Sequence, residues 1–184
     1  MKLFVIFYIM IYISAAVFAQ DSSKFILIKD IDSDNIADTI RLSPIDSVIV
    51  CSLSTRQYRR INSKKIYIDN ENTMGIRLIA SNRGFIYAFD WMRAGYSSEF
   101  VYDEQKKHIR LSKVSSYYLG NALGDGRHDT NLNLLTNEYN RSSFYFDNEK
   151  EVLVKEPDIR EKYESPLIYL EDYDDDIVFE LIGG

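Results

Sequence analysis

Cysteine, proline and helical patterning are all scarce in this chain of 184 residues. The single cysteine, Cys51, allows no intrachain disulfide, so the fold must be stabilised by packing or by a bound metal. Alternate positions around Cys51 are apolar, which predicts a buried and inert thiol. Three prolines and no low-complexity tract argue against an internal linker. No apolar stripe of helical period persists for three turns, which excludes a long amphipathic helix.

Catalytic motifs are also missing, because the sequence contains neither a G-x-S-x-G elbow nor a glycine-rich phosphate loop. Of the two histidines, His108 is predicted to decorate a strand face. His128 lies in the glycine-rich segment 120–131, where it is either a general base, a metal ligand or an ordinary loop residue. A pair of acids for glycoside hydrolysis stays open, since such pairing is spatial.

Positive charge is thinly spread along the chain, whose formal net charge is −6. The runs "SKK" at 63–65 and "QKK" at 105–107 are too short to form a basic cluster. Nucleic acid and anionic membrane surfaces are therefore not expected partners.

The N-terminus, "MKLFVIFYIMIYISAAVFAQ", has the pattern of a secretory signal peptide: Lys2, an apolar core at 3–13, then small residues. We expect cleavage after Ala19, which predicts a secreted or periplasmic protein with a single domain at 20–184. The alternative is an uncleaved membrane anchor. No later segment is apolar enough to cross a membrane, and Gln20 is not a lipid-anchor cysteine.

Short runs rich in Ile, Val, Tyr and Phe alternate with polar turns along the rest of the chain. They predict a mainly β fold of antiparallel sheets, as a sandwich, open barrel or propeller-like sheet with at most short helices. The clearest hairpins are "EFVYDEQKKHIRL" at 99–111 and "FYFDNEKEVLV" at 144–154. Segments 89–96 and 159–165 are expected to make a helical turn or two. The acidic tail is expected to contain a strand at 177–181 and to form a solvated sheet edge.

Aromatic residues gather in "FIYAFDWMRAGY" at 85–96. Exposed, Tyr87, Trp91 and Tyr96 would form a candidate binding surface with His128. The alternation of Phe85, Tyr87 and Phe89 favours the other interpretation, in which the ring side chains of this strand belong to the core.

The stretch "DIDSDNIAD" sets four aspartates between two apolar runs, without a lysine or arginine among them. Counted from Asp30, the acids Asp30, Asp32, Asp34 and Asp38 occupy positions 1, 3, 5 and 9, and Ile36 at position 7 can offer its carbonyl. This oxygen spacing suits Ca²⁺, and Asn35 at position 6 tolerates the positive φ of a sharp turn. A plain polar turn is the alternative. An EF-hand is excluded, because position 12 is Arg41 and the flanks are strand-like.

This loop resembles the D-x-D-x-D-G-x-x-D calcium loop of integrin-type FG-GAP and VCBS repeats, with Asn35 in place of the glycine. With "NLLTN" at 133–137, the chain is also similar to bacterial secreted proteins that carry one such loop. The resemblance implies a structural calcium and a binding module whose partner is a protein or a cell-envelope polymer. Some similar periplasmic proteins act as inhibitors or immunity partners of cell-wall-degrading enzymes. The alternative is an extracellular hydrolase of a polysaccharide or peptidoglycan.

Overall fold

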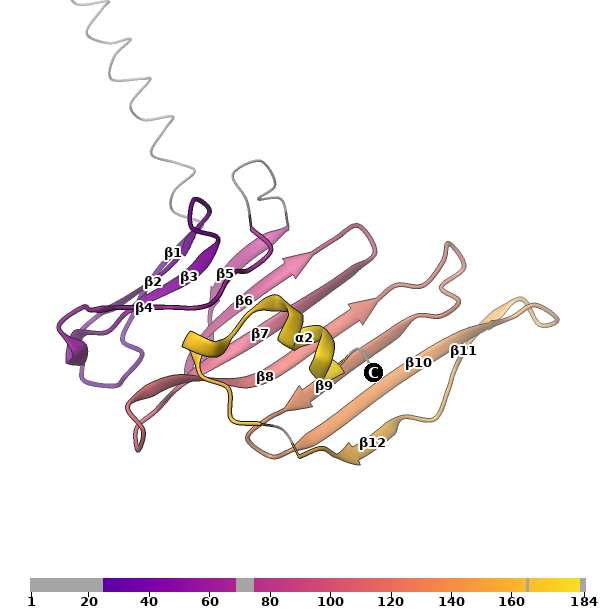
Figure 1. Ribbon diagram of the computed structural model, residues 1–184. Coiled ribbons are helices and arrows are strands. Elements are labelled where there is room, and N and C mark those ends of the chain that lie inside the picture. Colours follow the sequence, from indigo (N-terminus) through magenta and orange to yellow (C-terminus); the bar gives the residue numbers. More distant parts are fainter. Residues whose placement is uncertain (1–24, 69–74, 165, 183–184) are drawn as a thin grey trace, which may run out of the picture.

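In the computed structural model, which describes residues 25–68, 75–164 and 166–182, the chain forms two antiparallel sheets and one α-helix (Figure 1). The predicted signal peptide therefore lies outside the described residues. The smaller sheet has the order β1-β2-β3-β4. Its strands are β1 (Ile26–Lys29), β2 (Asp38–Ser43), β3 (Val48–Ser52) and β4 (Arg60–Asn62), with the 3₁₀ turn η2 (Ser54–Arg56) between the last two.

The larger sheet is a meander in the order β11-β10-β9-β8-β7-β6-β5, with β12 also paired to β10. Its strands are β5 (Ile76–Ala80), β6 (Gly84–Asp90), β7 (Ala94–Asp103), β8 (His108–Tyr118), β9 (His128–Asn133), β10 (Glu138–Asp147), β11 (Val152–Lys155) and β12 (Ile159–Lys162). The prediction of a mainly β, antiparallel fold is confirmed, and the described residues form no closed barrel. Both predicted hairpins are present, as β7–β8 and β10–β11.

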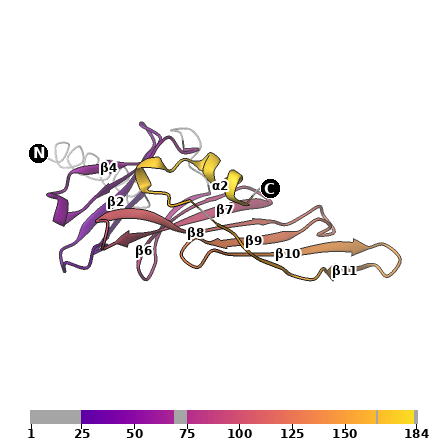
Figure 2. The same ribbon diagram turned by 60° about the horizontal axis from the view of Figure 1, so that its bottom comes forward.

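Both sheets and the helix share one hydrophobic core. The small sheet and α2 (Asp175–Ile182) lie on the same side of the large sheet, and its other face is uncovered by the described elements (Figure 2). The alternation in β6 explains this, since Phe85 and Tyr87 are fully buried while Ile86 between them faces outward and is half-buried. Each such large apolar side chain contributes about 1.5–3 kcal/mol when fully buried.

The far edge of the large sheet is one long strand interrupted by proline. β11 and β12 both run antiparallel to β10, and Pro157 lies between them. Proline has no N–H to donate, so an edge strand is where a sheet tolerates it. This end of the sheet projects beyond the core as a single layer (Figure 2).

The C-terminal segment corrects one prediction, because 177–181 is helical and not a strand. The Asp174 carboxylate accepts a hydrogen bond from the Ile177 backbone N–H at 3.1 Å, which caps the helix. Buried Val178, Leu181 and Ile182 follow a helical period. A short 3₁₀ turn, η3 (Leu170–Asp172), precedes the helix.

Two further helical predictions are wrong. Segment 89–96 is the tight turn between β6 and β7, in which the Trp91 N–H donates to the Ala94 carbonyl at 2.7 Å. Most of segment 159–165 is strand β12, whose residues pair with β10. In both places pairing with a neighbouring strand decides the conformation, and this is invisible to local periodicity.

Candidate metal centre

The aspartate loop joins β1 to β2, which pair directly, with Lys29 opposite Asp38. The Asp30 carboxylate holds the turn, accepting backbone N–H bonds from Ser33 at 2.8 Å and from Asn35 at 2.9 Å. Asn35 has a φ of 68°, so the predicted positive φ at this position is confirmed. The loop is therefore a strand–turn–strand element, as its flanks predict.

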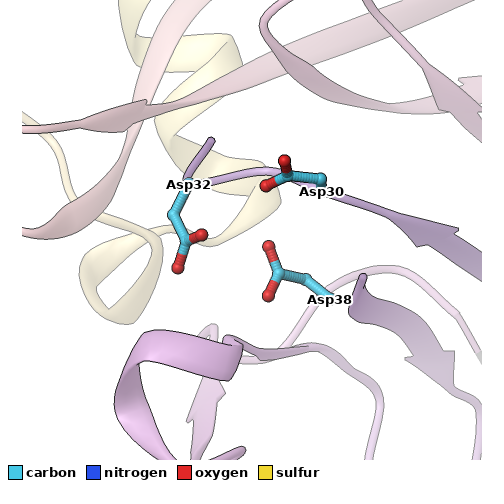
Figure 3. Close-up of side chains that lie close together, drawn as sticks. All are labelled: Asp30, Asp32 and Asp38. Carbon is cyan, nitrogen blue, oxygen red and sulfur yellow. The ribbon is translucent and has the colours of Figure 1, made fainter. Parts of the chain in front are cut away.

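Three of its carboxylates meet: Asp30, Asp32 and Asp38 each offer an oxygen within 4.8 Å of the others (Figure 3). Asp32 is 8% exposed and Asp38 is fully buried, while Asp30 is half-buried. These three side chains, called the acidic triad below, can hold a metal ion.

Asp38 connects the loop to the small sheet. One of its oxygens accepts the Ile31 N–H at 2.7 Å, and the other accepts the Ser54 N–H at 2.8 Å. Because Ser54 begins η2, the carboxylate fastens the β1–β2 loop to the turn that follows β3. Each carboxylate oxygen has a second lone pair, so these hydrogen bonds leave room for a metal.

Asp32 is the least satisfied member of the triad. Its Oδ2 accepts a hydrogen bond from the Thr55 hydroxyl, but its Oδ1 is buried without a hydrogen-bond partner among the described residues. Burial raises the pKa of Asp32, and the charges of Asp38 and Asp34 raise it further, against the Thr55 hydrogen bond. A buried carboxylate oxygen without a donor is costly, and a cation would satisfy it.

The other two predicted ligands lie outside the triad. The Asp34 carboxylate accepts hydrogen bonds from the Ser54 hydroxyl at 2.6 Å and from the Ile36 N–H at 2.8 Å. The Ser54 hydrogen bond is the main reason that the pKa of Asp34 is lowered. Asp34 and the Ile36 carbonyl thus stay predicted ligands.

Ser54 and Thr55 are the contacts that sequence reasoning missed. They lie 16 to 23 residues from the acids that they bind, and no local spacing links them. Among the described residues, none of the loop aspartates forms an ion pair with a lysine, arginine or histidine. The loop therefore gathers negative charge that the described chain does not neutralise.

The candidate aromatic surface is split by the fold. Tyr87 and Tyr96 are buried, because both point to the covered face of the large sheet, so they do not belong to an exposed platform. Trp91 is 43% exposed in the turn after β6, with its ring centroid 5.6 Å from that of Tyr96. Phe179 of α2 also packs against Tyr96, with ring centroids 5.8 Å apart.

Neither histidine approaches the triad. His128 opens β9, stacks near Tyr118 with centroids 5.6 Å apart, and places Nδ1 3.1 Å from the Gly126 carbonyl oxygen. His108 lies on β8, with Nδ1 3.3 Å from a carboxylate oxygen of Glu171. Their contacts fix them locally and bring no second metal-binding group to His128.

A second buried acid was predicted as part of a solvated edge and is not solvated. Asp175, at the start of α2, is 1% exposed and accepts hydrogen bonds from the Tyr67 N–H, from Tyr173 Oη at 3.1 Å and from Tyr87 Oη at 3.4 Å. Burial raises the pKa of Asp175, and these donors oppose the rise. This network fastens α2 to the large sheet.

Comparison of the chain with protein-family models, with curated proteins and with solved structures found no match. The resemblance to FG-GAP and VCBS loops therefore stays a prediction that rests on the loop alone. Among the described residues, no helix combines the length and the apolar character needed to span a bilayer.

Proposed function

We propose that the acidic triad binds Ca²⁺ and that the protein is a calcium-stabilised binding module of the cell exterior. The observation that carries the metal is the buried, unpartnered Oδ1 of Asp32, beside the carboxylates of Asp30 and Asp38. Hard carboxylate oxygens suit Ca²⁺, which accepts irregular geometry, whereas Mg²⁺ demands a tighter octahedron and keeps its waters.

Electrostatics explains why the ion would stabilise the fold. Two unit charges 4.8 Å apart repel by about 0.9 kcal/mol at the dielectric constant of water and by about 3.5 kcal/mol at an effective value of 20. A divalent cation turns this repulsion into attraction, and it would link the β1–β2 loop to η2 through Asp38 and Thr55. Extracellular calcium modules bind with dissociation constants of about 10⁻⁴–10⁻³ M. Tenfold excess over such a constant stabilises by about 1.4 kcal/mol.

An exposed apolar surface supports the binding role. It consists of Tyr67, Trp91, Met92 and Phe179, which are 52%, 43%, 98% and 46% exposed. Trp91 and Phe179 both pack on buried Tyr96, and Tyr67 packs on Phe179 at 6.5 Å. Rigid aromatic residues and methionine are typical of protein interfaces. We propose this surface as the contact with a protein or cell-envelope polymer, such as a cell-wall-degrading enzyme that the protein inhibits.

Calorimetric titration of metal-free protein with Ca²⁺ tests the metal. We expect saturable binding of one ion, little heat with Mg²⁺, and loss of binding in Asp32→Asn. The control is Asp46→Asn, which alters an exposed aspartate in the β2–β3 turn that accepts the Ser43 hydroxyl at 2.8 Å. Absence of calcium binding in the unaltered protein would contradict the proposal and would mean that the aspartate loop is a plain polar turn.

A peptidoglycan assay tests the second half of the proposal. With calcium present, we expect the protein to bind peptidoglycan or to slow its hydrolysis by an added lysozyme, and Trp91→Ala to weaken the effect. Clearing of peptidoglycan by the protein alone would instead establish the hydrolase alternative.

Mass spectrometry of the protein exported from a bacterial host would test cleavage after Ala19.

A further inference from the structure

A pocket of about 340 Å³ opens between η2 and the β7–β8 turn. It is lined by Thr55, Arg56, Tyr102, Lys106, Lys107 and His108. Two of these residues belong to the short run "QKK", which gives no basic cluster in the sequence. The fold adds Arg56, fifty residues earlier in the chain, and thereby makes one.

The positive charges in this pocket are not neutralised. Among the described residues, the side chains of Arg56, Lys106 and Lys107 form no ion pair, although the protein has an excess of acids. Nη1 of Arg56 is buried and has no hydrogen-bond partner there. Buried guanidinium donors are normally satisfied, so this N–H is available to bind an anion.

The two lysines are presented by a fixed turn. The Asp103 carboxylate accepts the Gln105 N–H at 3.0 Å and the Lys106 N–H at 3.1 Å, and the Asp103 carbonyl accepts the Lys107 N–H at 2.7 Å. Lys107 has a φ of 55°, which reverses the chain into β8. The backbone of the turn is thus ordered before a ligand binds, so only the exposed lysine side chains lose freedom on binding.

We propose that this pocket binds a phosphoryl group. The Arg56 guanidinium offers a planar fork, the two lysines offer mobile charge, and the Tyr102 hydroxyl can donate to a further oxygen, whereas Thr55 already donates its one proton to Asp32. Three acids compete nearby: Glu171, whose carboxylate lies 3.3 Å from His108, and Asp32 and Glu104, whose charges both act on Tyr102. The site is separate from the acidic triad and does not require the metal.

Calorimetric titration with inorganic phosphate tests the site. The protein is freed of metal with a chelating resin, because EDTA is itself a polyanion that can occupy the pocket. Saturable binding is expected, weakening as salt is raised. Arg56→Gln, and separately Lys106→Ala with Lys107→Ala, are expected to weaken binding at least about tenfold, the loss expected for a charge-assisted hydrogen bond. Lys113→Ala, an exposed lysine of β8 outside the pocket, should change the affinity less than about twofold.

Three results would overturn the proposal: no phosphate binding, equal binding by a correctly folded Arg56→Gln protein, or binding of citrate without phosphate. In the metal-free protein, Asp32→Asn should bind phosphate at least as tightly as the unaltered protein, because it removes a nearby negative charge, so failure of the calcium site and failure of this site are distinguishable. A second arm measures cosedimentation with phosphatidylglycerol vesicles. Phosphate binding without vesicle binding assigns a soluble phosphorylated ligand, and binding in both arms assigns a lipid headgroup.

Discussion

Replacing Asp32 by asparagine should raise the stability of the metal-free protein while abolishing its response to calcium. The change keeps the size of the side chain and its contact with Thr55, but it removes one of three charges that lie within 4.8 Å of each other. Each of the two repulsive pairs that disappear costs between about 0.9 and 3.5 kcal/mol. The hydrogen bond from Thr55 becomes weaker when its acceptor is neutral, by about 1 kcal/mol. The two pairs outweigh this loss even at the lower figure, so we expect a net gain of at least about 1 kcal/mol.

Thermal unfolding followed by circular dichroism measures both effects. In a domain of this size 1 kcal/mol shifts the melting temperature by about 2–4 °C, so metal-free Asp32→Asn should melt at least about 2 °C above the unaltered protein. Calcium at tenfold excess over its dissociation constant should raise the melting temperature of the unaltered protein by about 3–6 °C. The variant should hardly respond. In Asp46→Asn the response to calcium should persist.

The refuting result is equally clear. If metal-free Asp32→Asn melts below the unaltered protein, the Asp32 carboxylate is stabilising without an ion, and the argument from repulsion is wrong. If calcium raises the melting temperatures of Asp32→Asn and of the unaltered protein equally, the ion binds elsewhere.

Three further outcomes follow from buried groups. Because the pKa of Asp175 is raised, its contribution to the free energy of unfolding is greatest below about pH 3.8, its ordinary pKa, and falls as the pH rises through the folded pKa. In urea unfolding, Asp175→Asn should therefore lower the free energy of unfolding by about 1–3 kcal/mol at acidic pH and by less at neutral pH. Gly84→Ala should lower stability by about 1–3 kcal/mol in the same assay, because a Cβ there would lie 1.9 Å from the Phe100 carbonyl oxygen. Cys51 is fully buried, and burial is the main reason that its pKa rises to about 12, so iodoacetamide should label it only at the rate of unfolding in a mass-spectrometric assay.

The β architecture can be predicted from the sequence, because the buried and exposed faces of a half-buried strand appear as an alternation of apolar and polar residues. Alternation around Phe85 and Tyr87 predicts which side is covered, and the polar turns at 103–107 and 147–151 separate strands that do pair. The helix α2 was missed because Ile177 and Val178 are β-branched and suggest a strand. Its signals were nevertheless present: the Asp174 cap, the acids of the first turn and the helical spacing of Val178 and Leu181.

The candidate metal centre is only partly predictable from the sequence, for a different reason. Spacing within the loop predicts which acids can meet, and Asp30, Asp32 and Asp38 do meet. It cannot predict that the Asp34 carboxylate binds the Ser54 hydroxyl, because Ser54 lies in a different loop, the one that follows β3. The basic pocket has the same origin: Arg56 lies fifty residues before Lys106, and only the packing of η2 beside the β7–β8 turn brings them together.

The acidic triad and the basic pocket influence one another through the residues between them. Thr55 donates to Asp32 and also lines the pocket. Tyr102 lines the pocket too, and the charge of Asp32 is, after burial, a cause of its raised pKa. The negative field of the triad therefore extends into the place that we assign to a phosphoryl group, and it opposes an anion there. A cation in the triad would cancel that field and strengthen anion binding, and linkage requires the anion to strengthen cation binding by the same factor. An acid cluster and a basic pocket that share Thr55 are thus a reason to expect two ligands of opposite charge that bind cooperatively.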